Sequence, residues 1–384
     1  MRGLVLEGGG AKGSYHCGAI KALYENGYSF DGVAGTSIGA INGAIVAQDN
    51  NVSTLLDLWT NLQPSDVIDI DDEQLAKLNN KKFDKATIKY MASKAFHTLK
   101  NLGLPTDKII PFLKKYIDED KVRASGRDYA LVTYSISERK PLELFLEDIP
   151  YGHLHEYIFA SAYFPLFKFN RIQGKYYMDG GVYDNLPLNT LGNKGYDEIV
   201  AIRTNMDKNK HYRPLENKNV KLIMIEPHEY LGKAANMNLE KIAYNMKLGY
   251  YDAIRVIKDY KGLHYYFPTL DYDDIRNFLI NLSEKTIQDI KILLKLPSIT
   301  SKWGVINAIY YFTKGDNVVC DNEESFVRFL EIYAKKYGVE RFCYYTFNEF
   351  LDVLQKTYIE LNANKEVTTK EDLLFNMIMS MEEQ

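Results

Sequence analysis

Short apolar runs alternate with stretches of helical period along the first part of the chain. Residues 3–6 and 32–35 are predicted as buried strands, each followed by a helical stretch, 14–26 ended by Gly27 and then 38–48. Two strands joined through a helix pair in parallel, and the helix covers one face of the sheet. The pattern therefore predicts an α/β fold built on a parallel sheet.

Four later apolar runs extend this sheet. Residues 128–135 and 141–146 are separated by a short polar connection, which predicts a hairpin or two adjacent strands. Residues 197–203 and 220–225 are predicted as further buried strands. The sheet is therefore expected to extend to about residue 225.

Helical periodicity dominates two other parts of the chain. Residues 51–122 are mostly helical in period and indicate a cap inserted into the sheet domain. After Leu239 the period stays helical except for a short extended run at 264–267, and the acidic turn at 271–274 marks a boundary. We therefore expect an α/β domain over residues 1–270 and a C-terminal helical region over residues 271–384.

The composition is that of an ordinary globular protein. The 384 residues are 46% hydrophobic and 26% charged, which excludes a disordered chain and a disulfide-stapled miniprotein. Lys and Arg total 47 against 51 Asp and Glu, so we expect no nucleic-acid partner. Cys17, Cys320 and Cys343 have neither disulfide-framework nor zinc-site spacing, which favours a reducing, cytoplasmic location. No signal peptide or transmembrane helix is predicted, so membrane contact is expected from one side.

A glycine-rich loop separates the first predicted strand from the first helix. It consists of Gly8, Gly9, Gly10, Ala11, Lys12 and Gly13. The G-x-G-x-x-G spacing suits a dinucleotide-binding turn, a phosphate loop or an oxyanion hole, because each aims backbone N–H groups at an anion. A phosphate loop needs Gly-Lys-Ser/Thr, which is absent here. A dinucleotide turn needs an acidic residue after the second strand, whereas Asp31 precedes that strand.

The second predicted strand leads into Gly35-Thr36-Ser37-Ile38-Gly39, which has the G-x-S-x-G spacing of a nucleophile elbow. Its glycines leave room for a sharp turn that exposes the hydroxyl of Ser37, and the following helix directs its positive end at an alkoxide. Ser37 as a simple helix cap is the alternative. Because adjacent parallel strands end side by side, the glycine loop is expected to face the carbonyl that Ser37 attacks, which favours the nucleophile.

A serine nucleophile requires a base, and two candidates follow later in the chain. Asp179 stands before Gly180 and Gly181, whose flexibility allows a tight turn, and it acts as a base only where its surroundings raise its pKa or stabilise the transition state. An ordinary Asx turn at Asp179 is equally consistent with the spacing. Among the histidines, His228 follows a predicted strand and is the alternative base.

The three motifs occur in the order found in patatin-like phospholipases, which the chain resembles. That family has G-G-G-x-K/R-G, G-x-S-x-G and D-G-A/G, matched here by the glycine loop, the elbow and Asp179 with Gly180 and Gly181. The stretches 160–165 and 184–187 also resemble the family's A-S-x-x-x-P and N-x-P segments. The resemblance covers roughly residues 1–205 and implies a three-layer α/β/α, flavodoxin-like core.

The resemblance also implies a chemistry, namely hydrolysis of lipid acyl esters by a Ser-Asp dyad, without metal or other cofactor. Ser37 would be the nucleophile, Asp179 the base, and the loop from Gly8 to Gly13 the oxyanion hole, with Lys12 adding positive charge or simply solvated. A phospholipase A is the leading hypothesis. A lysophospholipase, general esterase or acyltransferase with the same dyad remains open, as do a nucleotide-binding protein and a regulated effector or interaction protein.

Two features suggest partners. Ten lysines between Lys77 and Lys115, against two aspartates, form either a solvated helix face or a strip that attracts anionic lipid headgroups. The apolar stretch 375–381 is more typical of a core helix than of a membrane contact. We therefore expect a phospholipid or membrane surface as a peripheral partner, and a regulatory ligand or protein acting on residues 271–384 as a further possibility.

Overall fold

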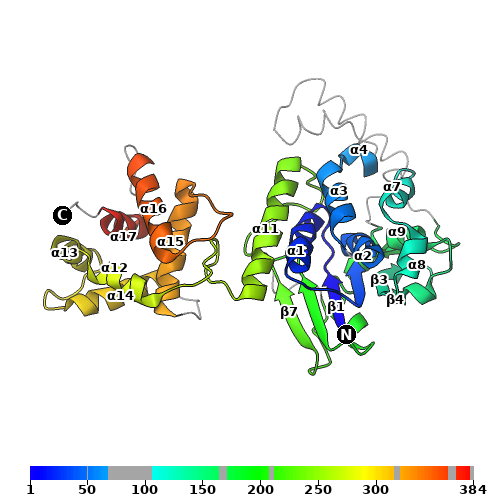
Figure 1. The fold of residues 1–384 in the computed structure, drawn as a ribbon, viewed down its shortest axis with the longest axis horizontal. Helices are drawn as coiled ribbons and strands as arrows, with labels where there is room; N and C mark the ends of the chain where they lie inside the picture. Colours follow the sequence, from blue (N-terminus) through cyan, green and yellow to red (C-terminus); the bar gives the residue numbers. More distant parts are fainter. Residues whose placement is uncertain are drawn as a thin grey trace, which may run out of the picture. The chain divides into compact units, whose positions relative to one another are not determined.

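The computed structural model describes residues 1–49, 51–67, 106–163, 171–206, 212–314, 321–361 and 369–380. The chain divides into two compact units, Met1–Val256 and Ile257–Gln384 (Figure 1). This division falls inside helix α11 (Leu239–Lys258), upstream of the boundary predicted at residue 270.

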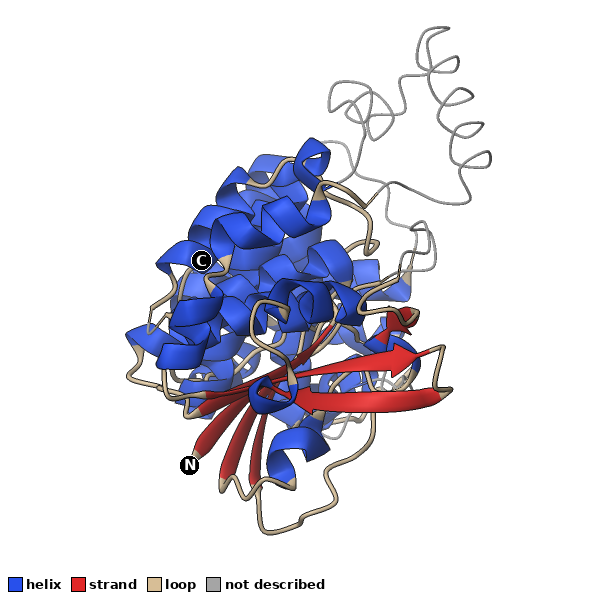
Figure 2. Ribbon diagram, turned by 90° about the vertical axis from the view of Figure 1, so that its right-hand side faces the viewer, coloured by secondary structure: helices blue, strands red, loops and turns tan. Residues whose placement is uncertain are grey.

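The first unit contains a mixed sheet, in which seven strands are found among the described residues (Figure 2). The strands are β1 (Arg2–Leu6), β2 (Gly32–Thr36), β3 (Asp128–Ser135), β4 (Lys140–Phe145), β5 (Tyr177–Asp179), β6 (Glu198–Ile202) and β7 (Lys221–Ile225). Their spatial order is β4, β3, β2, β1, β6, β7, and β5 pairs with β3. β1, β2, β3, β6 and β7 are parallel, whereas β4 and β5 run antiparallel to β3. The predicted parallel core and the adjacent pair at 128–146 are confirmed.

Helices cover both faces of this sheet and make three layers. α1 (Ser14–Glu25) and α2 (Ile38–Gln48) are the predicted crossovers, and α1 ends before Gly27, whose φ of 78° is left-handed. A Cβ at Gly43 of α2 would meet Val33, while Ala34 packs in the cluster formed by α10 (Leu188–Gly192). Because neighbouring residues of a strand point to opposite faces, α2 and α10 lie on opposite sides. The predicted α/β/α class is confirmed.

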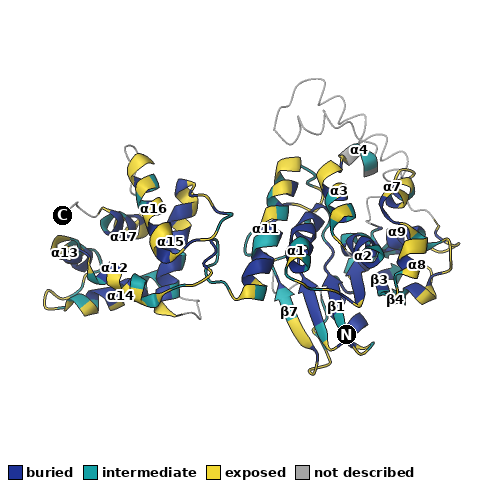
Figure 3. Cartoon of the chain, in the orientation of Figure 1, coloured by how far each residue is buried: buried dark blue, intermediate teal, exposed yellow. Residues whose placement is uncertain are grey.

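The environment of β7 differs from the prediction. The sequence predicts a buried strand over residues 220–225, but Lys221 and Leu222 are exposed (Figure 3). β7 is the last strand in the spatial order, so one of its edges has no neighbouring strand. Lys221, whose ammonium lies 2.8 Å from a Glu198 carboxylate oxygen, gives this edge the charge that opposes pairing with another chain.

The described parts of the inserted segment are mostly helical. α3 (Ser53–Asn61), α4 (Pro64–Val67) and α7 (Ile109–Tyr116) precede α8 (Glu119–Ala124), which leads into β3. Residues 68–105, and with them most of the lysine strip, lie outside the described residues. The first unit also contains the helix α9 (Leu154–Ser161) and the 3₁₀ turns η1 (Gly10–Gly13), η2 (Leu146–Asp148) and η3 (Gly180–Val182).

The second unit is helical and has its own aromatic core. Its helices are α12 (Tyr272–Ile280), α13 (Glu284–Leu293), α14 (Lys302–Lys314), α15 (Asn322–Tyr337), α16 (Phe347–Leu361) and α17 (Lys370–Met379). The fully buried rings of Phe326, Phe350 and Phe375 lie in this core, together with Ile378. The apolar stretch that begins at Phe375 is therefore part of a core helix, as the sequence favoured, over the part that is described.

Candidate active site

β3 brings the ends of two distant strands together. The last residue of β2, Thr36, is paired with Val132, and the last residue of β5, Asp179, is paired with the next position, Thr133. Since β2 runs parallel and β5 antiparallel to β3, the two strands approach each other end to end along the same edge. Ser37, which follows Thr36, therefore lies beside Asp179. The Ser37 hydroxyl lies close enough to the Asp179 carboxylate to lower the pKa of that carboxyl group.

The turn at Ser37 has the geometry of a strained elbow. Ser37 has φ 57° and ψ −123°, an unusual conformation for a non-glycine residue, and stands at the N-cap of α2. A Cβ at Gly35 would lie 2.2 Å from the Gly39 carbonyl oxygen, and one at Gly39 would lie 2.2 Å from that of Leu6. Both glycines are therefore required by close backbone contacts. The elbow does not act as a cap, since no side-chain hydrogen bond from Ser37 closes the helix.

A residue that the sequence did not single out holds the elbow in place. The Ser37 N–H donates to the hydroxyl of Ser161 at 3.0 Å, and that hydroxyl donates to the Val132 carbonyl at 2.6 Å. Ser161 is fully buried at the end of α9. It belongs to the stretch 160–165 that carries part of the family resemblance, although residues 164 and 165 lie outside the described part of the chain.

Asp179 is held by the turn that follows it. The Gly181 N–H donates to the Asp179 carboxylate at 2.8 Å, so the Asx turn considered from the sequence is present together with the contact to Ser37. A Cβ at Gly180 would lie 2.1 Å from the Val132 carbonyl oxygen, which explains the glycine there. Burial raises the pKa of Asp179 above 3.8, while the nearby Ser37 hydroxyl and the hydrogen bond from the Gly181 N–H oppose that rise. A higher pKa makes the carboxylate a stronger base.

The glycine loop borders Ser37, but part of its backbone is already engaged. A Cβ at Gly8 would lie 3.3 Å from the Cβ of Ser37. The N–H groups of Gly8, Ala11 and Lys12 donate to the carbonyls of Asn185, Ala234 and Gly9, respectively. Those of Gly9 and Gly10 donate to no described residue. The amides of Gly9 and Gly10 are therefore open to an anion. Gly10 has a left-handed φ of 59°.

A buried carboxylate that belongs to none of the sequence motifs organises this loop. Glu7, the last residue before the loop, is fully buried and accepts the N–H groups of Thr204 at 2.6 Å and Asn205 at 3.1 Å. The Asn185 amide donates to Glu7 and to the Gly8 carbonyl, each at 3.3 Å. The Lys12 ammonium donates to the side-chain oxygen of Asn205, so it is anchored to the same network. In the sequence, Glu7 is only an interruption of an apolar strand.

The alternative interpretations of the site receive no support from their key residues. β7, which precedes His228, is three strands away from β2, or about 14 Å at the usual strand spacing. His16 is fully buried, and desolvation lowers its pKa to about 3. Asp31, which a dinucleotide turn would need near the glycine loop, accepts the Arg2 N–H at 2.7 Å, at the opposite end of β1.

Two observations concern metals and membranes. No three His, Cys, Asp or Glu side chains gather as metal ligands within the residues that the structure describes. None of the helices in the described ranges combines the length and apolar character needed to cross a bilayer.

Comparison with known proteins gives a family and distant relatives. A model of the patatin-like phospholipase family matches residues 4–191. Neuropathy target esterase sws of Drosophila sechellia is 51% identical over 53 residues, which are 14% of this chain and only 4% of that protein. VipD from Legionella pneumophila has a TM-score of 0.40 and 16% identity over 99% of this chain and 90% of its own. ExoU of Pseudomonas aeruginosa, solved with SpcU, has a TM-score of 0.31 and 14% identity, and the match covers 97% of this chain and 76% of the ExoU chain.

Proposed function

The chain belongs to the patatin-like phospholipase family through residues 4–191, and from this premise we propose that it is a lipid acyl hydrolase of the phospholipase A type. Ser37 is the proposed nucleophile and Asp179 the proposed base. The observation that carries the proposal is the pairing of the ends of β2 and β5 with adjacent residues of β3, which brings the Ser37 hydroxyl close enough to Asp179 to lower the pKa of its carboxyl group. Because Ser37 and Asp179 are far apart in the sequence, only the folding of the chain brings them together.

The reaction proceeds in two halves. In the first, Ser37 Oγ attacks the ester carbonyl carbon while Asp179 accepts the hydroxyl proton, and the collapsing intermediate releases an alcohol that takes this proton. In the second, water attacks the acyl-serine, Asp179 accepts its proton, and Ser37 regains a proton as the fatty acid leaves. The N–H groups of Gly9 and Gly10 and the positive end of α2 stabilise the oxyanion in both halves. An alcohol in place of water would make the same site an acyltransferase.

Covalent labelling tests the nucleophile whatever the natural substrate is. A fluorophosphonate that reacts with activated serines should add one adduct to the parent protein, and peptide mapping should locate it at Ser37. Asp179→Asn should slow labelling by about 10²-fold or more, because the hydroxyl loses its base. Asp259→Asn, at an exposed position outside the site, is the matched control and should label at the parent rate. An adduct on another serine, or equal labelling of Asp179→Asn, would refute the assignment.

We further infer that the protein meets its substrate at a lipid surface. Ile292 at the end of α13, Ile299 in the following connection and Trp303 at the start of α14 are 76%, 93% and 55% exposed. Large exposed apolar side chains within one short stretch of the chain suit the interfacial region of a bilayer, where Trp is favoured. Most of the lysine strip lies outside the described residues, so this inference does not depend on it.

Trp303 provides the test, because the chain contains two tryptophans and the other, Trp59, is buried. Anionic phospholipid vesicles should shift the emission of Trp303 to shorter wavelength and bring the protein down on sedimentation. Ile299→Ser should weaken vesicle binding several-fold, whereas Ile359→Ser, at another exposed isoleucine, should not. Vesicle binding with no spectral shift would show that this connection is not the contact.

A further inference from the structure

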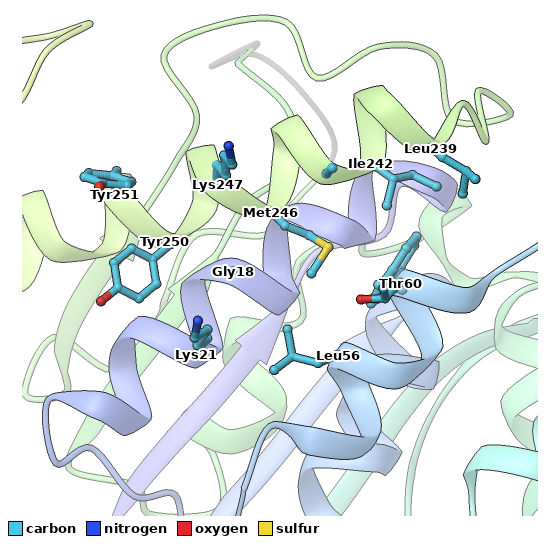
Figure 4. A pocket seen from close by; sticks show the side chains of 12 residues that line it. Gly18, Lys21, Leu56, Thr60, Leu239, Ile242, Met246, Lys247, Tyr250 and Tyr251 are labelled. Atoms are coloured by element: carbon cyan, nitrogen blue, oxygen red, sulfur yellow. The ribbon is translucent and has the colours of Figure 1, made fainter. Parts of the chain in front are cut away.

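A groove of about 580 Å³ lies between α1, α3 and α11 in the first unit (Figure 4). Leu56 of α3 and Ile242 and Met246 of α11 give it an apolar body. The volume is within the range typical of small-molecule sites, about 300–1,000 Å³. The groove is therefore large enough for one extended amphiphile.

Two glycines explain why the groove forms. A Cβ at Gly18 of α1 would lie 1.8 Å from the Met246 carbonyl oxygen, and one at Gly249 of α11 would lie 2.1 Å from that of Tyr15. The two helices therefore cross in backbone contact. The groove opens beside this crossing, where α3 forms the facing wall.

The charge in the groove is concentrated on two lysines. Figure 4 shows Lys21 of α1 and Lys247 of α11 near Tyr250, while Leu239 and Thr60 lie toward the other end. Lys247 is exposed and forms no ion pair with a described residue. Lys21 lies 3.8 Å from a Glu25 carboxylate oxygen in a half-exposed pair, an interaction worth little. None of the described residues lining the groove is acidic. The Glu25 carboxylate beside Lys21 accepts the Tyr250 hydroxyl at 2.8 Å, and the two lysines together exceed it by one positive charge, which complements an anion.

The groove is separate from the candidate active site but linked to it. Trp59 forms part of its wall, and the indole N–H donates to the Asn42 side-chain oxygen at 3.2 Å. The Asn42 amide in turn donates to the Gly13 carbonyl at 3.0 Å. Neither Ser37 nor Asp179 lines the groove. The hydrogen bonds of Trp59 and Asn42 connect the groove to Gly13, at the end of the glycine loop.

We propose that this groove binds a free long-chain fatty acid, with its chain along Leu56, Ile242 and Met246 and its carboxylate between Lys21 and Lys247. A single chain with one negative end matches both the apolar body and the pair of ammonium groups. The fatty acid is the product class of the proposed hydrolysis. The binding itself rests on the groove's own residues and requires no catalysis at Ser37.

Trp59 makes the proposal measurable. In Trp303→Phe the buried Trp59 is the remaining tryptophan, and a fatty acid brominated at mid-chain quenches an indole that it touches. Titration below the aggregation concentration of this probe should quench Trp59 saturably, by about half or more. The same titration on Trp303→Phe with Ser37→Ala should give the same curve, because binding does not involve the nucleophile.

Two groove variants and one control locate the site. Ala243→Phe, at an exposed alanine of the lining, should fill the apolar body and abolish quenching. Lys247→Glu should weaken binding of the brominated acid about tenfold and leave binding of its methyl ester unchanged. Lys114→Glu, at an exposed lysine of α7 outside the groove, should bind both probes as the parent does. Thermal unfolding of each variant verifies that it is folded.

The outcomes separate this proposal from the hydrolase proposal. Absence of Trp59 quenching in the folded parent would overturn the groove as a site, and quenching that survives Ala243→Phe would place the probe elsewhere. Equal loss of acid and ester binding in Lys247→Glu would overturn recognition of the carboxylate. Failure of fluorophosphonate labelling at Ser37 would refute the hydrolase alone, since none of these titrations depends on turnover.

Discussion

Replacing Gly39 by alanine tests the geometry of the elbow without changing either residue of the proposed dyad. The added Cβ would lie 2.2 Å from the Leu6 carbonyl oxygen and 2.8 Å from the Leu6 carbonyl carbon. Cβ atoms essentially never approach other atoms more closely than 3.0 Å, so the start of α2 must retreat from β1 by at least 0.8 Å. Because Ser37 immediately precedes α2, its hydroxyl moves with the helix.

The cost has two parts. Overpacking of this kind destabilises a fold by about 1–3 kcal/mol, which should lower the melting temperature of the first unit by several degrees. A displacement of about 1 Å at a nucleophile costs about 10²-fold in rate. We therefore expect Gly39→Ala to remain folded and to hydrolyse a soluble short-chain ester with kcat/KM about 10²-fold below that of the parent.

Gly43→Ala, one turn further along α2, is the matched control. A Cβ at this position would first meet the Val33 Cγ1 methyl at 3.1 Å, a side-chain contact that yields easily. Alanine also favours the helix over glycine by about 1 kcal/mol. Its kcat/KM should therefore stay within about twofold of the parent value. The reasoning fails if Gly39→Ala retains parent activity, or if Gly43→Ala loses as much.

Three further predictions follow from polar groups around the site. Burial raises the pKa of Asp179 above 3.8, and a base must be deprotonated to act. The kcat/KM on a soluble ester should therefore already fall at a pH above 3.8 as the solution is acidified. A kcat/KM that stays constant down to pH 3.8 would contradict this. Burial raises the pKa of Asp184 to about 7, so the folded state binds a proton that the unfolded state releases, and stability should decrease as pH rises from about 4 to 7. Urea unfolding across this range should show a loss of up to about 4 kcal/mol that Asp184→Asn removes, and an unchanged slope would refute the assignment. Ser161→Ala leaves the Ser37 N–H without its acceptor and should cost about 1–3 kcal/mol in unfolding and about tenfold in kcat/KM; parent values for both would show that the contact is dispensable.

Local patterns in the sequence predicted much of the fold. The strand and helix periods located β1, β2, β3, β4 and β6, and the glycines on either side of Ser37 predicted the elbow. β7 shows the limit of this reasoning. An apolar run looks the same in a central strand and in an edge strand, and only the neighbours in the sheet decide which it is.

The parts of the site that escaped prediction depend on contacts between distant segments. β5 has three residues, too few to show a period, and its meeting with β2 depends on pairing with β3. Glu7 and Ser161 are single polar residues in apolar surroundings, and their roles become visible only with their partners Thr204 and Ser37 in place. The six loop amides were equivalent in the sequence, whereas those of Gly8, Ala11 and Lys12 donate to other backbone carbonyls in the structure.

The most direct test of the central claim is acyl release from phospholipid vesicles and from a short soluble ester by the parent, Ser37→Ala and Asp179→Asn. We expect the parent to cleave both substrates and each variant to lose about 10³-fold or more while its melting temperature shows it to be folded. The double variant should be no worse than either single one, because the two residues act as a unit. Full activity of Asp179→Asn would contradict the dyad and require another base, such as His228.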